Sequence, residues 1–401
     1  MKKILLISQN FYPEVGSAAN RMKQLFRYFT KHYNTKLLTT EAQYPNRDIY
    51  KEEKFWNEND LDQEQITRVK TRTAKYETKM FFRLLLYIET MFQFLLKIWK
   101  EKESFDVVYV SSPPIFIALV GLVAKRKFKA KLIVDIRDLW PESLQGVGKF
   151  NSPIFLRIAY WLESKIYKHA DQIVINSESF APYIINKGVN PERITFVPNS
   201  LTQEEIALGS AIRPILREPI TVIYAGNIGL AQELESFIRM AEHFKNNESV
   251  RFKMIGYGTN YAKLVHEVEI KQLQNITVHP PDTRANVWEK LLKSDIAFVS
   301  LVPHPVFEAV IPGKVIDYMG CGLPIIGMVS GYAKHTIETA RTGFIFRHED
   351  ELSMYRQLEQ LIEDASLRAE LRRNGLAYAQ QNYSWHKNFD RIKNVVASSS
   401  C

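Results

Sequence analysis

The sequence predicts an α/β protein made of two doubly wound, Rossmann-like domains, each built on a parallel sheet. Short apolar runs rich in Val and Ile alternate with segments of helical periodicity, which is typical of parallel strands covered by helices on both faces. The same alternation restarts after residue 218. The length of 401 residues exceeds one average domain and suits two of about 200 residues each.

The first domain is expected over residues 1–203. Its first strand is residues 4–8, and the helix that follows has one apolar face formed by Met22, Leu25, Phe26 and Phe29. Residues 41–75 are polar and predict a long loop, and the apolar stretch 80–100 predicts a helix. Further strands of the same sheet are expected at residues 35–39, 107–110, 131–135, 172–176 and 194–197.

A polar segment, residues 201–218, is expected to separate the domains; Pro214 lies inside it and Pro219 directly follows it. The second domain is expected over residues 218–382, and a last helix within 383–401 is expected to cross back to the first. Its strands are expected at residues 220–224, 250–255, 276–279, 296–301, 324–328 and 343–346. Doubly wound sheets bind ligands at the carboxyl ends of their strands, so a cleft where two such edges meet is the expected site.

The composition narrows the class of partner. Hydrophobic residues make up 46% and charged residues 24%, which excludes a disordered or fibrous chain. The net charge of +9 suits an anionic partner such as a nucleotide, a nucleic acid or an acidic membrane. Two cysteines, Cys321 and Cys401, provide neither a disulfide framework nor a zinc cluster, which favours a cytoplasmic protein without a metal site.

Two segments of the first half place polar groups at strand ends. Gly16 lies in a loop of small residues before a helix, where backbone N–H groups can approach an anion, and Arg21 can bind a phosphate. Asp135 and Asp138 can accept sugar hydroxyls or a proton, and Arg137 can bind phosphate or keep an acid ionised. The structural alternatives are an ordinary turn with a solvated Arg21, and a helix cap with Trp140 in the core.

The second half contains glycines at strand ends and one basic helix start. Gly226 and Gly229, then Gly256 followed by Tyr257, allow a ligand to approach the backbone, with the tyrosine as a stacking face. Lys314 and Asp317 share a helix face, where Lys314 can neutralise a diphosphate and Asp317 can accept two ribose hydroxyls. The alternative for this pair is a surface salt bridge.

Taken together, these motifs resemble the retaining family-four glycosyltransferases of the GT-B fold, above all the bacterial branch that builds O-antigen and capsule repeat units. The resemblance covers nearly the whole chain. Its marks are Tyr12-Pro13-Glu14 with Gly16 and the segments 135–142, 225–229 and 312–324.

The resemblance implies a UDP-sugar donor, used as a substrate, and retention of configuration without a cofactor or required metal. It also implies a polyprenyl-diphosphate-linked saccharide acceptor at the inner face of the cell membrane, and an N-acetylated hexosamine or N-acetyl-L-fucosamine as the transferred sugar. The expected catalytic residues are Asp138, Arg137, Lys314 and Glu308. The expected donor-binding residues are Gly16, Asn227, Gly229, Gly256, Tyr257, Val310, Ile311, Lys314 and Asp317. The expected acceptor-binding residues are Glu14, Arg21, Asp135 and Trp140.

The chain departs from the family pattern at three positions. The first acid of the family's paired-acid motif would lie at Ala309, and Glu308 is one residue away. The basic pair of the family's donor loop falls near Asn227 and Gln232, which are both neutral. Lys314 is therefore the candidate that meets the diphosphate charge.

The sequence does not decide what the helix at 80–100 packs against. Its aromatic and basic side chains suit a membrane interface, a place in the core, or a mixture of the two. Three alternative functions remain beside transfer: a GT-B UDP-sugar epimerase, a basic nucleic-acid- or membrane-binding protein, and an idle scaffold. No nucleic-acid recognition module is present in the sequence, so a nucleic-acid partner is not expected. The oligomeric state is left open.

Overall fold

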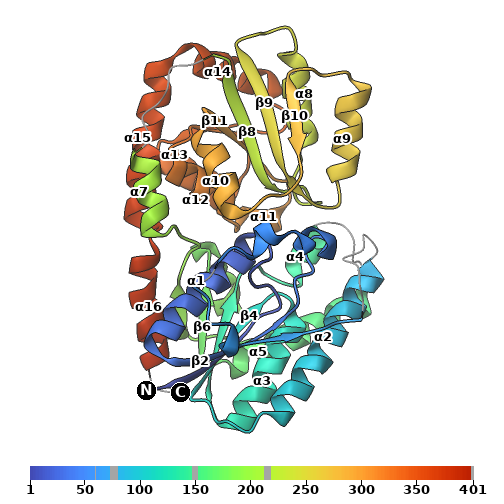
Figure 1. Cartoon of the computed structure of the whole chain (residues 1–401), viewed down its shortest axis with the longest axis vertical. Helices are drawn as coiled ribbons and strands as arrows, with labels where there is room; N and C mark the ends of the chain where they lie inside the picture. The colour runs from blue at the N-terminus through green and yellow to red at the C-terminus, as the bar shows by residue number, and fades with distance from the viewer. Residues whose placement is uncertain (59, 73–79, 147–151, 212–217, 399–401) are drawn as a thin grey trace. The chain divides into compact units, whose positions relative to one another are not determined.

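The computed structural model describes the whole chain except residues 59, 73–79, 147–151, 212–217 and 399–401. It divides into two compact units, one formed by Met1–Pro198 with Lys387–Cys401 and the other by Asn199–His386. Each unit contains one sheet in which all paired strands are parallel (Figure 1). The predicted α/β fold with two Rossmann-like parallel sheets is therefore confirmed.

The sheet of the first unit has the strand order β3-β2-β1-β4-β5-β6-β7. Its strands are β1 (Lys3–Ile7), β2 (Asn34–Thr40), β3 (Ile66–Val69), β4 (Val107–Ser112), β5 (Lys131–Ile136), β6 (Gln172–Ile175) and β7 (Ile194–Phe196). Its helices are α1 (Ser17–His32), α2 (Met80–Lys100), α3 (Ile115–Phe128), α4 (Glu142–Gly146), α5 (Pro153–His169), α6 (Ala181–Asn186) and most of α16 (Trp385–Ala397).

Central strands of this sheet are buried on both faces, as their apolar composition requires. Every residue of β4, β5 and β6 is buried. Helices α2, α3 and α5 lie side by side on one face of the sheet, and α1 and α16 lie on the other (Figure 1). The last two are joined by stacked rings of Tyr28 and Phe389, whose centroids lie 4.4 Å apart.

Residues from Lys387 onward belong to the first unit through direct contacts. The Lys2 ammonium donates to the carbonyl of Val396 at 2.9 Å, and the Lys131 ammonium donates to the carbonyl of Val395 at 2.6 Å. The Asn388 side chain donates to the carbonyl of Pro198 at 2.8 Å. Helix α16 thus completes the unit in which the chain begins.

The second unit has a sheet of strand order β10-β9-β8-β11-β12-β13. Its strands are β8 (Ile220–Asn227), β9 (Val250–Tyr257), β10 (Ile276–His279), β11 (Ile296–Ser300), β12 (Ile325–Met328) and β13 (Gly343–Ile345). Its helices are α7 (Gln203–Ala211), α8 (Glu235–His243), α9 (Tyr261–Ile270), α10 (Arg284–Leu292), α11 (Pro305–Glu308), α12 (Gly313–Cys321), α13 (Gly331–Thr339), α14 (Glu351–Glu363) and α15 (Ala365–Asn382).

Two segments contain more structure than the sequence predicts. The expected loop 41–75 holds the edge strand β3 and three short 3₁₀ turns, and its residues 59 and 73–75 lie outside the described part. The expected boundary segment 201–218 contains helix α7, which packs against α12 and α15 of the second unit. Residues 212–217 of that segment lie outside the described part.

Helix α2 packs by one stripe and leaves other apolar side chains in solvent. Leu86, Thr90, Phe94 and Ile98 recur every four residues and are buried. The exposed large side chains of the helix are Phe82, Leu85, Phe92, Leu96 and Trp99. Among the described residues, no helix has the length and apolar character needed to span a membrane.

Candidate active site

Bare backbone marks the carboxyl ends of β8 and β9 in the second unit. Gly226 and Gly256 are register partners, and a β-carbon on Gly256 would lie 2.0 Å from the carbonyl oxygen of Gly226. Gly226 has φ of +139°, which favours glycine. Both positions therefore require glycine, and the backbone at these two strand ends carries no side chain.

Lys314 lies over this bare backbone from the first turn of α12. A β-carbon on Gly226 would lie 3.2 Å from its Cε and 3.3 Å from its Nζ. Its ammonium lies 3.8 Å from the ring centroid of Tyr224 and donates a hydrogen bond to that residue's hydroxyl. The amino group is thus held at the strand ends, beside the positive end of the α12 dipole.

The Lys314 ammonium has a pKa close to neutral pH. Burial lowers the pKa of its ammonium to about 7, although the Asp317 carboxylate acts in the opposite direction. An arriving anion stabilises the protonated form and raises that pKa. The site would therefore gain positive charge if a diphosphate bound there.

Asp317, one turn further along α12, is held by Arg284 of α10. Arg284 Nη2 lies 2.9 Å from Asp317 Oδ1, and its Nε lies 2.6 Å from Glu205 Oε1 of α7. Burial raises the pKa of Asp317 in spite of the guanidinium. The alternative prediction, a salt bridge between Lys314 and Asp317, is wrong for this arrangement, because Arg284 takes the carboxylate.

Arg284 is the residue of this site that sequence reasoning missed. Its side chain joins three helices and also lies 5.2 Å from the ring centroid of Trp288. The side chain of Asp317 is 26% exposed, so its oxygens keep room to accept hydroxyl donors. The predicted role in ribose binding is compatible with this geometry and stays a prediction.

The loop after β8 is closed by its own polar groups. The amide of Gly229 donates to Gln232 Oε1 at 3.1 Å. A β-carbon on Gly229 would lie 2.7 Å from Asn227 Nδ2, so the loop is closely packed. Tyr257 is the register partner of Asn227 and is half-buried. The predicted donor residues of β8 and β9 thus lie together at one sheet edge.

The residues before α12 differ in their exposure. Glu308 ends the four-residue helix α11 and is exposed, whereas Ile311 is 4% exposed and Val310 is half-buried. The carbonyl of Glu308 lies against Gly331, where a β-carbon would come within 2.1 Å of it. The predicted catalytic role of the Glu308 side chain is left untested by this placement.

Arg21 and Asp135 of the first unit form a closed, buried pair. Arg21 Nε lies 2.8 Å from Asp135 Oδ2 and its Nη2 lies 3.1 Å from Oδ1, while the Tyr109 hydroxyl donates to Oδ2 at 3.1 Å. Both side chains have no exposed surface. Each neutralises the other inside the fold, so this geometry favours a structural role, and the predicted acceptor role stays a prediction.

Glu14 is also occupied within the first unit. It is 7% exposed and accepts from Asn10 Nδ2 at 2.8 Å and from the amides of Gln43 and Tyr44 at 2.8 and 3.1 Å. Burial raises its pKa to about 7. These hydrogen bonds fix the loop after β2, and they give no support to the predicted acceptor role of Glu14.

Arg137 and Asp138 lie at the end of β5 and are half-buried. Arg137 Nε donates to the Ser111 hydroxyl at 2.7 Å and its Nη2 donates to the carbonyl of Pro113 at 2.5 Å, so it fixes the loop after β4. Burial raises the pKa of Asp138, although hydrogen bonds from Ser143 oppose the shift. Asp138 is therefore more basic than an ordinary aspartate.

Trp140 and Gly16 differ in how the structure places them. The ring of Trp140 makes edge contacts with Phe116 and Phe155 at centroid distances of 6.4 and 6.1 Å, which favours the packing alternative over acceptor binding. Gly16 is exposed, precedes α1 and has φ of +140°. It leaves the backbone at this helix start open, as donor approach requires.

Within the described part of the chain, no group of three or more His, Cys, Asp or Glu side chains is placed to hold a metal ion. The expectation that the reaction needs no metal or cofactor stays a prediction.

Comparison with protein families gives two consecutive matches. The model described as "Glycosyl transferase 4-like domain" matches residues 19–200, and "Glycosyl transferases group 1" matches residues 210–377. The chain belongs to the family-four glycosyltransferases. Both models describe glycosyl transfer, which favours a transferase over the epimerase and the non-enzymatic alternatives.

Curated relatives agree with this family. The chain is 24% identical over 337 residues to "Probable glycosyltransferase WbjE" of Pseudomonas aeruginosa, covering 80% of this chain and 81% of that protein. It is 22% identical over 343 residues to "Putative colanic acid biosynthesis glycosyl transferase WcaI" of Escherichia coli K12, with the same two coverages.

A solved structure shows the same fold. HepE of Anabaena, crystallised with UDP and glucose, matches with a TM-score of 0.68 at 15% identity, covering all of both chains. At this identity the likeness establishes the GT-B fold of this glycosyltransferase.

Proposed function

We propose that this glycosyltransferase moves a sugar from a UDP-sugar to a saccharide carried on a polyprenyl diphosphate, during assembly of a bacterial surface polysaccharide. The colanic acid assignment of WcaI and the UDP bound in HepE support the pathway class and the nucleotide. The donor sugar we propose is an N-acetylated hexosamine or N-acetyl-L-fucosamine, transferred with retention and without a metal. A lipid-linked acceptor places the enzyme at the inner face of the cell membrane.

One observation supports the donor site above all others: Lys314 lies over Gly226 at the end of β8, one helical turn from an Asp317 that Arg284 holds. The diphosphate is proposed to lie at the glycine-lined strand ends and the start of α12. Lys314 then stabilises the charge that develops on the leaving UDP, which is the main catalytic contribution of a preorganised cation. Asp317 accepts the ribose hydroxyls.

The first unit is proposed to contribute an acceptor-side base. Asp138 is the candidate, because its raised pKa favours uptake of a proton from the attacking hydroxyl. All four residues expected to bind the acceptor contact other groups of the first unit instead: Arg21, Asp135, Glu14 and Trp140.

Thermal unfolding with UDP, GDP or ADP tests the donor class. A nucleotide at 100 times its Kd should add about 2.7 kcal/mol to the free energy of unfolding. We expect stabilisation by UDP. Stabilisation by GDP or ADP in its place would contradict the proposed donor.

A transfer assay with Lys314→Met tests the charge stabilisation. Turnover should fall by about 100-fold or more, as for other lost transition-state donors. Lys293→Met is the matched control, since Lys293 is 65% exposed at the other end of α10 from Arg284. Equal turnover in the two variants would remove Lys314 from the mechanism.

A further inference from the structure

Three neighbouring helices of the first unit expose large apolar side chains to solvent. Trp99 of α2 is 76% exposed, and Ile154 and Trp161 of α5 are 74% and 57% exposed. Helix α3 packs against both α2 and α5 and so connects their surfaces. We call this surface the α2–α3–α5 face. Its exposed large apolar residues are Phe82, Leu85, Phe92, Leu96, Trp99, Val123, Ile154, Ile158 and Trp161.

The same helices are strongly basic. Together they contain nine Lys or Arg and only two acidic residues, Glu89 and Glu163. Glu163 is 1% exposed and lies 3.3 Å from the Lys187 ammonium. Glu89 accepts a hydrogen bond from the amide of Arg72 at 2.5 Å. The acidic groups are thus engaged, and the face as a whole is positive.

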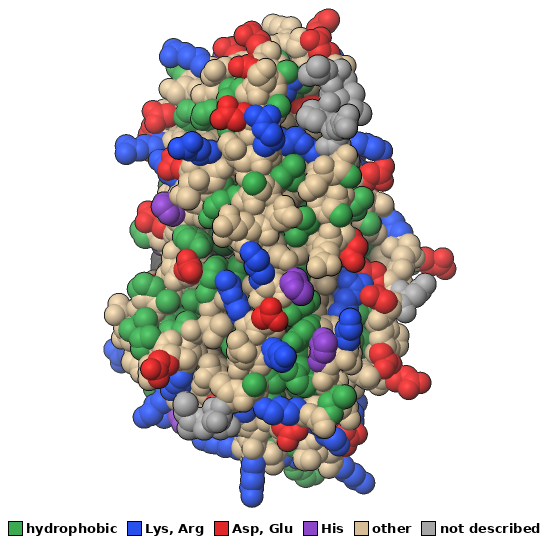
Figure 2. All heavy atoms as spheres, turned by 90° about the vertical axis from the view of Figure 1, so that its left-hand side faces the viewer, with side chains coloured by type: hydrophobic (Ala, Val, Ile, Leu, Met, Phe, Trp, Pro, Cys, Tyr) green, Lys and Arg blue, Asp and Glu red, His purple; other side chains and the backbone are tan. Residues whose placement is uncertain are grey.

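The side of the molecule shown in Figure 2 has a different character. On the side shown in Figure 2, Lys and Arg side chains intermingle with Asp and Glu. The excess of Lys and Arg over acidic residues on α2, α3 and α5, beside exposed apolar side chains, therefore differs from the mixed charge on that side.

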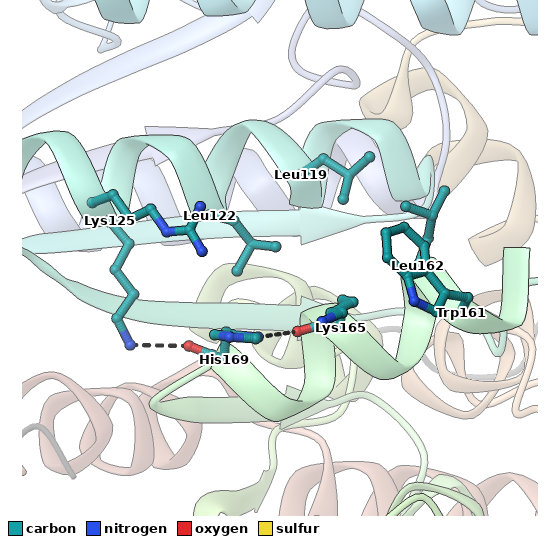
Figure 3. A pocket seen from close by; sticks show the side chains of 8 residues that line it. Leu119, Leu122, Lys125, Trp161, Leu162, Lys165 and His169 are labelled. Atoms are coloured by element: carbon teal, nitrogen blue, oxygen red, sulfur yellow. Dashed lines mark hydrogen bonds between the residues drawn. The ribbon is translucent and has the colours of Figure 1, made fainter. Parts of the chain in front are cut away.

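A cavity of about 360 Å³ lies between α3 and α5 within this face (Figure 3). Leu119, Leu122 and Leu162 give it an apolar lining, and Trp161 stands at one end. The basic lining residues are Lys125, Arg126, Lys165 and His169. A cavity lined by leucines and by basic side chains fits a molecule that has a hydrocarbon part and an anionic head. We call the Lys and Arg side chains of this lining its cationic mouth.

Of the three Lys and Arg side chains that line the cavity, two stay available to a ligand and one does not. The Lys125 ammonium is bound by the carbonyl of His169 at 2.9 Å and by Asp171 at 2.7 Å. Arg126 and Lys165 are exposed, and the Lys165 ammonium lies 5.6 Å from the ring centroid of Trp161. A tryptophan beside a cation suits the boundary between lipid headgroups and acyl chains.

We propose that the α2–α3–α5 face docks on a bilayer containing anionic phospholipid. Its exposed aromatic and aliphatic side chains enter the interface, and the Arg126 and Lys165 mouth binds a phosphate headgroup. The inference deepens the proposed function, because a lipid-linked acceptor lies in such a bilayer. It is tested without UDP or acceptor, so its failure is distinguishable from failure of the donor site.

Vesicle flotation of the full chain provides the test. We expect binding to phosphatidylglycerol-containing vesicles and much weaker binding to pure phosphatidylcholine. Raising the salt from about 0.1 M to about 0.5 M should weaken the binding, because it screens exposed charges. Absence of binding, or equal binding to both kinds of vesicle, would overturn the proposal.

Paired variants locate the surface. Ile158→Ser with Trp161→Ser should lower the vesicle partition coefficient by about tenfold or more, since both side chains leave water on docking. The matched control is Ile270→Ser with Leu352→Ser, which removes two side chains that are 67% and 66% exposed in the second unit. An equal loss in the control pair would mean that the surface lies elsewhere.

Charge-reversal variants measure the electrostatic contribution to vesicle binding separately from the apolar contribution. Arg126→Glu with Lys165→Glu should lower binding to the anionic vesicles, whereas Lys245→Glu with Arg373→Glu, two exposed positions of the second unit, should leave it unchanged. Thermal unfolding without any ligand, measured on every variant, verifies its fold. If Ile158→Ser with Trp161→Ser instead abolished a dimer in light scattering, the face would belong to a second copy of the chain.

Discussion

Arg284 holds Asp317 with two nitrogens, at 2.9 and 3.4 Å, while its third nitrogen binds Glu205 at 2.6 Å. One guanidinium therefore orients a carboxylate of α12 and fixes α10 and α7 around it. A ligand that uses Asp317 depends on this orientation, although Arg284 itself is directed toward protein groups.

Arg284→Lys should weaken UDP binding by about 10- to 100-fold, because lysine keeps the charge and loses the forked geometry. Isothermal titration with UDP measures the change. Arg251→Lys, an exposed position on β9, should bind as the parent does. A parent-like Kd for Arg284→Lys, or a loss in Arg251→Lys of the same size, would argue against a positioning role.

The pH dependence of donor binding should report Lys314. Its pKa of about 7 in the free protein means that the ammonium is mostly charged below pH 7 and mostly neutral above it. An anionic diphosphate prefers the charged form, so affinity should fall as the pH rises above 7, by at most about tenfold per pH unit.

Titration with an intact UDP-sugar tests this dependence, because the esterified diphosphate does not titrate near neutral pH. Lys314→Met should bind more weakly and lose this pH dependence, and Lys293→Met should keep it. A flat profile in the parent protein would show that Lys314 does not contact the diphosphate.

Gly256→Ala should disrupt the carboxyl ends of β8 and β9, where the donor is proposed to bind. Its β-carbon would lie 2.0 Å from the Gly226 carbonyl oxygen, so β8 and β9 must shift apart at about 1–3 kcal/mol of stability. UDP binding should fall with it. Gly188→Ala is the comparison, since it meets no atom within 4 Å and strains only its own φ of +87°. Thermal unfolding with and without UDP should show both variants destabilised, with UDP stabilisation reduced only in Gly256→Ala.

Asp135→Ala should lower the free energy of unfolding by about 3–5 kcal/mol, because Arg21 is left buried without its partner. Asp48→Ala breaks the exposed pair with Lys51 and should cost no more than about 1 kcal/mol. Urea unfolding measures both.

A double change, Arg21→Met with Asp135→Leu, should recover stability relative to Asp135→Ala, because no uncompensated charge remains. If it folds stably but no longer transfers sugar, the structural assignment of the pair is wrong and an acceptor role is restored.

The fold class could be predicted from the sequence because the strands are short, apolar and regularly separated by helices. This pattern is visible in residues that are close together in the sequence. Strand β3 escaped prediction because it has four residues, lies at the sheet edge and is set in a polar region. Local composition does not distinguish such a strand from a loop.

Pairings over long sequence separations set the limit of prediction at the site. Arg21 and Asp135 are 114 positions apart, and each alone has the character of a ligand-binding residue. Only the fold shows that they neutralise each other. Arg284 was missed for the converse reason, because its partners lie 33 and 79 positions away and no motif surrounds it. Lys314 could be singled out as a candidate because glycine, proline and a helix start mark its position locally.

The return of helix α16 to the first unit has a consequence for how the enzyme is made. Contacts of Lys2 and Lys131 with the last turns of α16 cannot form until Val395 and Val396 have been synthesised. The second unit, Asn199–His386, is one uninterrupted stretch and is complete before α16 leaves the ribosome. The first unit is therefore finished after the second, and a chain that stops shortly before residue 387 lacks part of the first unit.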